Sequence, residues 1–396
     1  MTPHPPALAP RTAKVPLWLL VMVTLAGTLA IHMFVPGLPD AAQALHSPPG
    51  QMQLTITVYV IGLGVGQLIY GPLSDSLGRR PMLLIGLSLY TLAGLVALLA
   101  PNVGTLIGAR LLQALGGCAG LALGRAIARD TATPETAVAN LALLNLMMMV
   151  GPGLAPLAGT VIDAAWGWRG ILAVLVAMGA VTLLGVWRLL PETSQPTGQL
   201  NWQRLRQDHV RLLRSRGFVS MALGGGCATM CSYGFLSAAP FIFTQQLHTS
   251  KHTMAVSLGL MIAGMAVGNA ATRQLAGRVS LQRVLLGANL LCLLLSAVLL
   301  GLTAADQVHL AALIALMLVF NIGIGLTSPA ALSQALNAEP ELVGTAAGVY
   351  GCLQMALGAL ATLLVSLGSN PLLAAMAVLF GGNVIGAVGF RLAFRK

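Results

Sequence analysis

Two ionisable side chains stand inside apolar stretches of the sequence and could carry proton chemistry. His32 lies in the first such stretch and Arg110 in the fourth. An imidazole titrates near neutral pH, so His32 could bind and release a proton, although a lone histidine can also serve only to hydrogen-bond a neighbouring helix. An arginine in an apolar layer normally faces a cavity or a partner, although Arg110 could instead extend its stem to the polar boundary. We expect these two residues to form a polar centre in the first half of the chain.

A second set of side chains offers aromatic, thioether and amide groups at depths where a cavity could form. Methionine repacks readily around ligands of different shape, and the chain has 17 of them. Together these groups would suit contacts with small amphipathic molecules, whereas each one taken singly fits ordinary packing equally well. The set comprises Phe34, Tyr59, Asn145, Met148, Tyr233, Phe235, Phe241, Gln245, Asn321 and Gln354.

The residue spacing gives no support to metal or enzyme chemistry. The sequence has no HExxH, GxSxG or Walker A spacing, which argues against an enzyme and against direct use of ATP. Its cysteines lie in apolar stretches and lack both the ligand set of a zinc site and the loop setting of a disulfide. We therefore expect no metal and no cofactor. The cysteines are Cys118, Cys227, Cys231, Cys292 and Cys352.

The elements that must position these side chains are membrane-spanning helices. Only 8% of the 396 residues are charged and 57% are hydrophobic, whereas soluble domains carry about 25% charged residues. Apolar stretches of about 20 residues recur along the chain, the length that a helix needs to cross a bilayer. We predict an all-α membrane protein with about twelve spans. The stretches begin near Val15, Leu54, Met82, Thr105, Ala137, Gly170, Phe218, Met254, Val284, Leu310, Gly344 and Pro371.

Basic residues between these stretches predict the orientation. Lys and Arg together number 21 against 10 acidic residues, and they sit in short loops rather than on a soluble surface that could bind nucleic acid. Lys and Arg accumulate in cytoplasmic loops, so we expect both termini in the cytoplasm and only Arg169 and Lys251 on the outer side. The inner loops would hold Arg79 and Arg80, Arg129, Arg204 to Arg216, Arg273 to Arg283, and the C-terminal Arg391, Arg395 and Lys396.

A polar stretch divides the chain into residues 1–191, a linker at 192–216 and residues 217–396. Leu205, Leu212 and Leu213 in the linker could form one face of an amphipathic helix on the inner leaflet, or the linker could be solvated. A short repeat supports the division. Leu77-Gly78-Arg79 matches Ala276-Gly277-Arg278, and each follows the second apolar stretch of its half.

The loop from Gly71 to Pro81, GPLSDSLGRRP, resembles the signature loop of the major facilitator superfamily. The resemblance implies twelve helices in two pseudo-symmetric halves of six, with a solute site between them. It also implies a latch that acts in conformational gating, with the roles carried by Gly71, Asp75, Gly78, Arg79 and Arg80.

Two further segments extend this resemblance. Arg110 to Gly116, RLLQALG, resembles the superfamily motif of the fourth helix. GPGLAPLAG, from Gly151 to Gly159, resembles a motif of its antiporters, with Ala158 where a glycine is usual. Prolines bend a membrane helix and glycines allow close packing, so Gly151, Pro152 and Pro156 are further gating candidates.

Finer resemblance indicates the Bcr/CflA branch of drug exporters. It is carried by HMFVPGLP from His32, GQLIYGP from Gly66, GRAIARD from Gly124, FLSAAPF from Phe235 and GTAAG from Gly344. The resemblance implies a monomeric exporter of amphipathic drugs driven by protons across the cytoplasmic membrane, with small molecule, proton and lipid as partners. That branch usually has an aspartate at the position of His32.

The missing aspartate leaves the coupling open. We expect no buried carboxylate, since Asp40, Asp75, Asp130, Asp163 and Asp306 lie at ends or loops. His32 could replace the aspartate with the opposite sign of charge change. The alternative is a dedicated exporter or facilitator of one small metabolite, such as an amino acid, nucleoside or sugar, without proton coupling.

Overall fold

The computed structural model describes residues 15–394 except 132, 133, 195, 197, 199–201 and 276. Regular structure in this part of the chain is helical, as the composition predicts. The first group of helices comprises α1 (Leu17–Phe34), α2 (Leu38–Ala44), α3 (Pro49–Leu77), α4 (Arg79–Leu98), α5 (Val103–Asp130) and α6 (Pro134–Leu189). The second comprises α8 (Arg216–Phe241), α9 (Lys251–Leu275), α10 (Leu281–Ala304), α11 (Leu310–Asn337), α12 (Val343–Ser366) and α13 (Pro371–Phe394). The linker helix α7 (Trp202–Arg214) stands between the groups.

Local chemistry explains several helix ends. Proline stands in the first turn of α3 and α13, where its missing N–H would have no partner in any case. Asn102 caps α5, because its side-chain oxygen accepts a hydrogen bond from the Thr105 amide at 2.9 Å. At the turn after α3, Gly78 adopts φ of 102°, and the matching Gly277 after α9 adopts φ of 81°. The two matching glycines of the sequence repeat therefore both have a positive φ.

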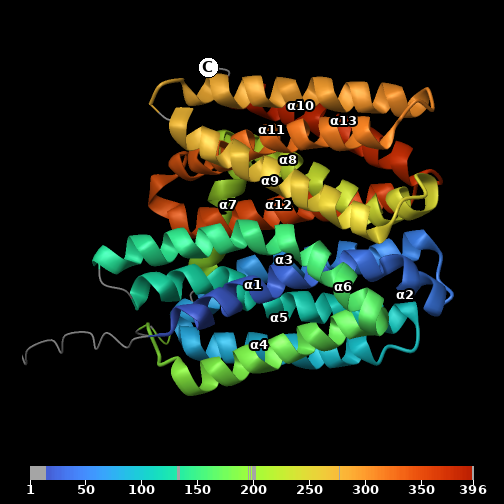
Figure 1. Cartoon of the computed structure of the whole chain (residues 1–396). Helices are drawn as coiled ribbons and strands as arrows, with labels where there is room; N and C mark the ends of the chain where they lie inside the picture. The colour runs from blue at the N-terminus through green and yellow to red at the C-terminus, as the bar shows by residue number, and fades with distance from the viewer. Residues whose placement is uncertain are drawn as a thin grey trace, which may run out of the picture.

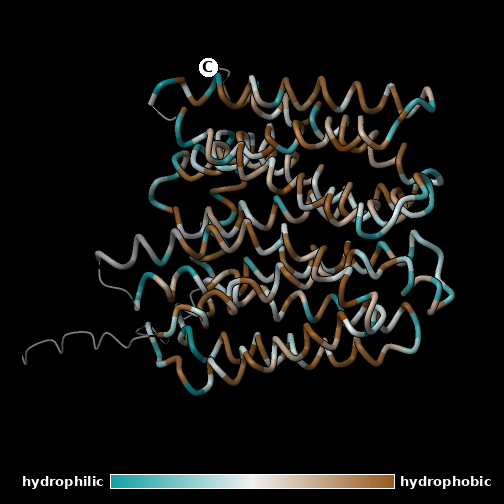
Figure 2. The backbone as a smooth tube through the Cα atoms, viewed as in Figure 1, coloured by the Kyte–Doolittle hydropathy of each residue, from teal (hydrophilic) through white to brown (hydrophobic). Residues whose placement is uncertain are grey.

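In the described part of the chain, 11 helices are long and apolar enough to cross a membrane. One of them spans 47 residues, Leu143–Leu189, because α6 joins two helices across a kink at Gly167. Dividing α6 there gives twelve crossings, as the apolar stretches predict. Figure 2 shows hydrophobic backbone through the middle of the bundle and hydrophilic segments gathered at its two ends. The protein is thus a multi-pass membrane protein.

The helices form two groups that lie side by side, α1 to α6 in one and α8 to α13 in the other (Figure 1). The groups meet where α3 packs on α12 and where α6 packs on α9. We call the end of the bundle that carries Arg79, Arg129, α7 and Arg278 the basic end, which lies on the left in Figure 1. The other end, where α2 lies, is called the opposite end.

The linker helix α7 packs on the basic end of the second group. Leu212 is fully buried in an apolar cluster with residues of α8, α11 and α12, whereas Leu213 remains 52% exposed. Arg211 pairs with Glu339 at 3.0 Å and with Glu341 at 2.9 Å. The predicted amphipathic helix therefore exists, and part of its apolar face is covered by protein rather than by lipid.

Candidate functional site

A cavity of about 510 Å³ lies between the two groups of helices. Its wall comes from α1, α3, α5 and α6 of the first group and α8, α9, α11 and α12 of the second. Gly71, Arg125 and Gly344, which lie near the basic ends of their helices, belong to this wall. The cavity therefore faces the basic end, and its volume is that of sites for drug-sized molecules.

The cavity wall is mainly apolar and rich in thioethers. Its polar groups are few and spread over both halves, among them His32, Arg125 and Asn321. A flexible apolar wall with scattered polar groups can accommodate ligands of different shape. The methionines of the wall are Met148, Met149, Met261, Met265, Met317 and Met355.

Half of the solute contacts expected from the sequence line this cavity, namely Met148, Tyr233, Phe235, Asn321 and Gln354. The others point elsewhere in this conformation. Phe34, Tyr59 and Phe241 are fully buried in the helix packing, and Asn145 and Gln245 are exposed outside the cavity wall. Those five residues are therefore not among the contacts that this geometry offers to a solute.

His32 faces the cavity from α1 and is only partly buried. Its Nδ1 lies 2.9 Å from the carbonyl oxygen of Thr28. Because a carbonyl oxygen can only accept, Nδ1 must carry the hydrogen in this contact, which leaves a lone pair on Nε2. The ring is therefore held in the tautomer that can bind a further proton at Nε2.

Arg110 does not line the cavity; it is fully buried in the first group. Its guanidinium donates to Gln113 Oε1 at 2.8 Å and to the Ala30 carbonyl at 2.9 Å, and it stacks on the rings of Phe34 and Tyr59. Charge-assisted hydrogen bonds contribute about 1.5–3 kcal/mol each. The two together are comparable to or larger than the cost of about 2.5–3.5 kcal/mol for an arginine at the centre of a membrane helix. His32 faces the cavity, whereas Arg110 is enclosed within the first group, so the two side chains do not form the single polar centre expected from the sequence.

Arg125, one of the residues of the fourth apolar stretch, lines the cavity. Its guanidinium donates to the sulfur of Met148 at 3.4 Å, and it belongs to none of the ion pairs among the described residues. Arg125 could have been predicted from the sequence as a cavity residue, because an arginine five positions inside the end of an apolar helix needs water or a partner.

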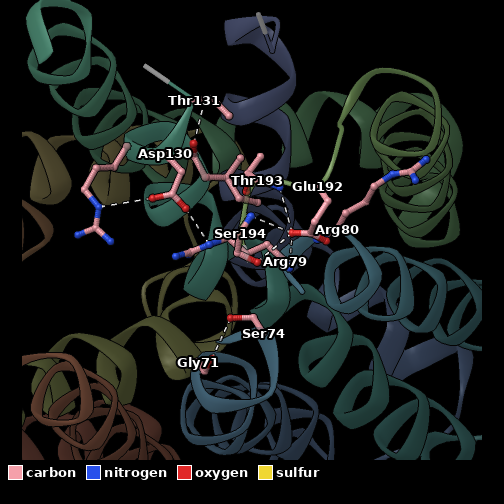
Figure 3. A network of polar contacts seen from close by, with 11 residues as sticks. Gly71, Ser74, Arg79, Arg80, Asp130, Thr131, Glu192, Thr193 and Ser194 are labelled. Atoms are coloured by element: carbon pink, nitrogen blue, oxygen red, sulfur yellow. Dashed lines mark hydrogen bonds and ion pairs between the residues drawn. The ribbon is translucent and has the colours of Figure 1, made fainter. Parts of the chain in front are cut away.

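The signature loop forms a polar network at the basic end (Figure 3). Arg79 pairs with Asp130 at 2.8 Å and so joins α4 to α5. Glu192, which follows α6, accepts hydrogen bonds from the backbone amides of Arg79 at 3.0 Å and Arg80 at 3.2 Å. A carboxylate placed on these amides satisfies the free N–H groups at the start of α4. The loop is therefore tied to α5 and α6 within the first group.

The pKa of Glu192 reflects this network. Burial acts to raise it, but hydrogen bonds from Ser194 and from the amides of Arg79 and Arg80 outweigh burial and leave the pKa below its ordinary value of 4.5. Gly78 is required at this turn, because its φ is positive and a Cβ there would come within 2.6 Å of Glu192 Oε2.

The glycine- and proline-rich segment of α6 lies between the halves. Gly151 packs against Leu25 of α1, and Gly153 packs against Ile262 of α9. Pro152 lines the cavity. The hydroxyl of Thr160 donates to the Pro156 carbonyl at 2.9 Å, inside a helix whose proline lacks its own N–H donor. Small residues thus let α6 approach helices of both halves closely.

Three charged residues join the halves at the opposite end. Lys251 of α9 places its Nζ 2.5 Å from Asp40 of α2 and 2.6 Å from Asp163 of α6. The side chain of Asp163 is only 2% exposed, so the expectation that the chain has no buried carboxylate was wrong. This cluster could not be recognised in the sequence, because 211 residues separate Lys251 from Asp40 and 88 separate it from Asp163.

Comparisons with known proteins agree with this architecture. A family model described as Major Facilitator Superfamily matches residues 20–363. The chain is 31% identical over 360 residues to "Chloramphenicol resistance protein" of Pseudomonas aeruginosa, covering 88% of this chain and 83% of that protein. It is 30% identical over 342 residues to "Multidrug resistance protein D" of Escherichia coli, covering 85% of each. It is also 30% identical over 379 residues to the uncharacterized MFS-type transporter YdgK of Bacillus subtilis, covering 94% of each.

Solved structures share the fold at low sequence identity. The nucleoside transporter NupG superposes with a TM-score of 0.75 at 12% identity, covering 96% of this chain and 99% of that one. A D-xylose-proton symporter superposes with a TM-score of 0.72 at 13% identity, covering 96% of each. The matched family model, the twelve crossings and the cavity between two groups of helices all lead to one assignment: this chain belongs to the Major Facilitator Superfamily and is a membrane transporter, not an enzyme.

Proposed function

We propose that this protein is a secondary active exporter of small amphipathic compounds, drugs included, across the cytoplasmic membrane. The observation that carries the proposal is the cavity of about 510 Å³ between the halves, with its methionine-rich apolar wall and few polar groups. Such a wall binds by shape-tolerant apolar contact, which suits a broad set of substrates. Two similar proteins bear names that refer to chloramphenicol and multidrug resistance, which supports the same substrate class.

The basic end lies in the cytoplasm in this proposal. Arg79, Arg129, Arg278 and the linker helix α7 are all at that end, whereas the described Lys and Arg residues of the opposite end are Arg169 and Lys251. The positive-inside rule places the more basic loops in the cytoplasm. The cavity then faces the cytoplasm, the side from which an exporter collects its substrate, and an even number of crossings puts both termini there.

Protons supply the energy through His32 in this proposal. The Nε2 of His32 binds a proton when the cavity opens to the acidic outer side and releases it when the cavity faces the cytoplasm. Arg110 acts as a positioning residue, because its hydrogen bond to the Ala30 carbonyl anchors α1 two residues before His32. Substrate binding beside His32 favours release of the proton, so the two ligands exchange across the membrane.

The test is transport by the purified protein in liposomes with an imposed proton gradient. The probes are chloramphenicol and other neutral amphipathic drugs. Each drug should accumulate on the acidic side of the membrane, and each addition of drug should release a burst of protons. Liposomes without the protein, and liposomes whose gradient is collapsed by an ionophore, are the controls. Drug accumulation that persists without the gradient would refute proton coupling, and no drug movement under any gradient would refute drug export.

A further inference from the structure

The charged groups of the cavity wall all have one sign. Arg125 lines the cavity with its guanidinium, and a guanidinium stays protonated in proteins. His32 can add positive charge but no negative charge. Of the ten acidic residues, only the side chain of Glu135 lies outside the described part of the structure, and none of the other nine lines the cavity. We propose that the cavity selects neutral and anionic amphipathic molecules and rejects organic cations, an inference that rests on the proposed function.

The hydrogen bonds of Arg125 explain how an anion would be held. A guanidinium has five N–H donors, and Arg125 directs one of them at the sulfur of Met148, which is a weak acceptor. A carboxylate or sulfonate can replace this sulfur and form a paired, charge-assisted contact. A carbonyl or nitro oxygen of a neutral drug can accept the same donors singly.

Organic cations meet the reverse situation. A cation that leaves water for this cavity finds Arg125 as a like charge, and among the described wall residues no carboxylate compensates for its lost hydration. Rejection by like charge is an ordinary source of specificity. The substrate is thus an aromatic or aliphatic body against the methionines, with its acceptor group turned to Arg125 near the basic end.

Three probes with one aromatic body test this selectivity: naphthoic acid as the anion, naphthamide as the neutral compound and naphthyl-trimethylammonium as the cation. Binding to the purified full-length protein is measured by titration calorimetry. The ammonium compound should bind at least about tenfold more weakly than naphthoate, the size expected for one charged contact. This comparison needs no variant. Equal affinity for the anion and the cation would overturn the inference.

Substitutions at Arg125 then assign the effect to one side chain. Arg125→Gln should weaken naphthoate binding about tenfold while naphthamide stays within about twofold, and Arg125→Lys should keep the preference for the anion. Arg129→Gln is the matched control, because it removes the same charge one turn along α5, where the side chain is 68% exposed and pairs with Asp130. An unchanged affinity of Arg125→Gln for naphthoate would overturn the inference. Failure of the wild type to bind naphthamide and chloramphenicol would instead overturn drug export itself.

A different observation carries a second inference, at the opposite end. We infer that Lys251, Asp40 and Asp163 form an ionic lock that holds the cavity closed there. Lys251 belongs to the second half and both carboxylates belong to the first, so the two ion pairs are the bonds that must break if the halves separate at this end. Asp163 is buried and pairs with this cation. A buried carboxylate that loses its partner must be rehydrated.

The lock is tested by access to a reporter thiol from the opposite end. Leu258→Cys places the thiol in the cavity wall on α9, two turns below Lys251, in a background without the native cysteines. Lys251→Met should increase the rate of labelling by a membrane-impermeant maleimide at least about fivefold, because the open state gains population. Lys251→Met combined with Asp163→Asn leaves no uncompensated buried charge, because the remaining carboxylate, Asp40, is 43% exposed. This double variant should show the same increase, which guards against misfolding of the single variant.

Arg169→Met is the control for the lock. Arg169 is a cation of the same end, but it donates to the carbonyls of Leu98 and Ala100 within its own half. Its loss should leave the labelling rate within about twofold of the wild type, since no contact between the halves is removed. Unchanged labelling in both Lys251 variants would overturn the lock, as would an equal increase in Arg169→Met.

Discussion

The two arginines of α5 that lie inside its apolar stretch have the same side chain and opposite surroundings. Arg110 is enclosed by hydrogen bonds and two aromatic rings, so its charge serves the packing of the first half. Arg125 is exposed to the cavity, where its charge acts on whatever enters. A residue type alone therefore does not decide between a packing role and a binding role. The number of partners that the surrounding helices supply decides it.

The role of His32 can be separated from packing by substitution. His32→Gln keeps a hydrogen-bonding group for the Thr28 carbonyl but cannot titrate, so accumulation of drug against a gradient should fall to the level seen without a gradient. Downhill exchange should remain measurable. His32→Asp should retain part of the coupling. The measurement is drug uptake in liposomes with and without an imposed proton gradient.

The controls for His32 are the folded fraction and the affinity for a neutral drug, both of which should stay close to those of the wild type in His32→Gln. A glutamine variant that still concentrates drug as the wild type does would show that the histidine is structural. Coupling would then depend on another group or be absent.

Five of the ten solute contacts expected from the sequence line the cavity, and the other five do not. The reason for the difference is physical. In a membrane helix the lipid face and the packing face are both apolar, so periodicity does not tell which face looks into a cavity. Phe34 and Tyr59 illustrate this, because both turn toward Arg110 instead. The pairing of Lys251 with its two carboxylates could not be predicted from the sequence. The loop sequences do not show which helix ends, far apart in the chain, lie next to each other.

At the scale of single elements, the start of α4 depends on a residue that follows α6. Glu192→Gln should lower the free energy of unfolding by about 0.5–1 kcal/mol, the usual worth of a helix cap reduced by solvent screening. Because folding lowers the pKa of Glu192, its contribution should be fully present above pH 4.5 and should be lost as the pH falls through the folded-state pKa. The measurement is the thermal midpoint of the purified protein at several pH values.

Glu341→Gln provides the comparison for this cap. Glu341 lies at the same end and pairs with Arg211, but its side chain is 74% exposed, so its loss should shift the midpoint much less. Equal shifts for the two variants would mean that the carboxylate of Glu192 does not cap α4.

The helices themselves were largely predictable, because length and hydrophobicity suffice to mark a membrane span. Ten apolar stretches correspond to single spans in the structure, and the kink at Gly167 accounts for the two stretches merged in α6. Helix bounds differ from the predicted starts by a few residues, for instance at α3, which begins at Pro49 rather than near Leu54. Prolines and capping residues extend helices beyond the apolar core, and hydrophobicity does not register them.

At the scale of the whole molecule, the proposed orientation makes the two ends distinguishable by thiol labelling. Gln307→Cys, in the exposed loop after α10, should react with an impermeant maleimide added outside intact cells. Arg278→Cys, at the basic end, should react only after the membrane is made permeable. The native cysteines give little background, because four of the five are buried. The reverse pattern would invert the orientation.

The methionine wall exposes the transporter to oxidants. Oxidation turns each flexible thioether into a polar sulfoxide, and methionine sulfoxide reductases reverse the change. Met148, Met149 and Met261 face the same space that an apolar substrate must fill, together with Met265, Met317 and Met355. Hypochlorite or peroxide would therefore make the cavity more polar and weaken its hold on apolar compounds before it unfolds the protein. Export capacity would then follow the redox history of the cell, and its recovery would depend on sulfoxide repair.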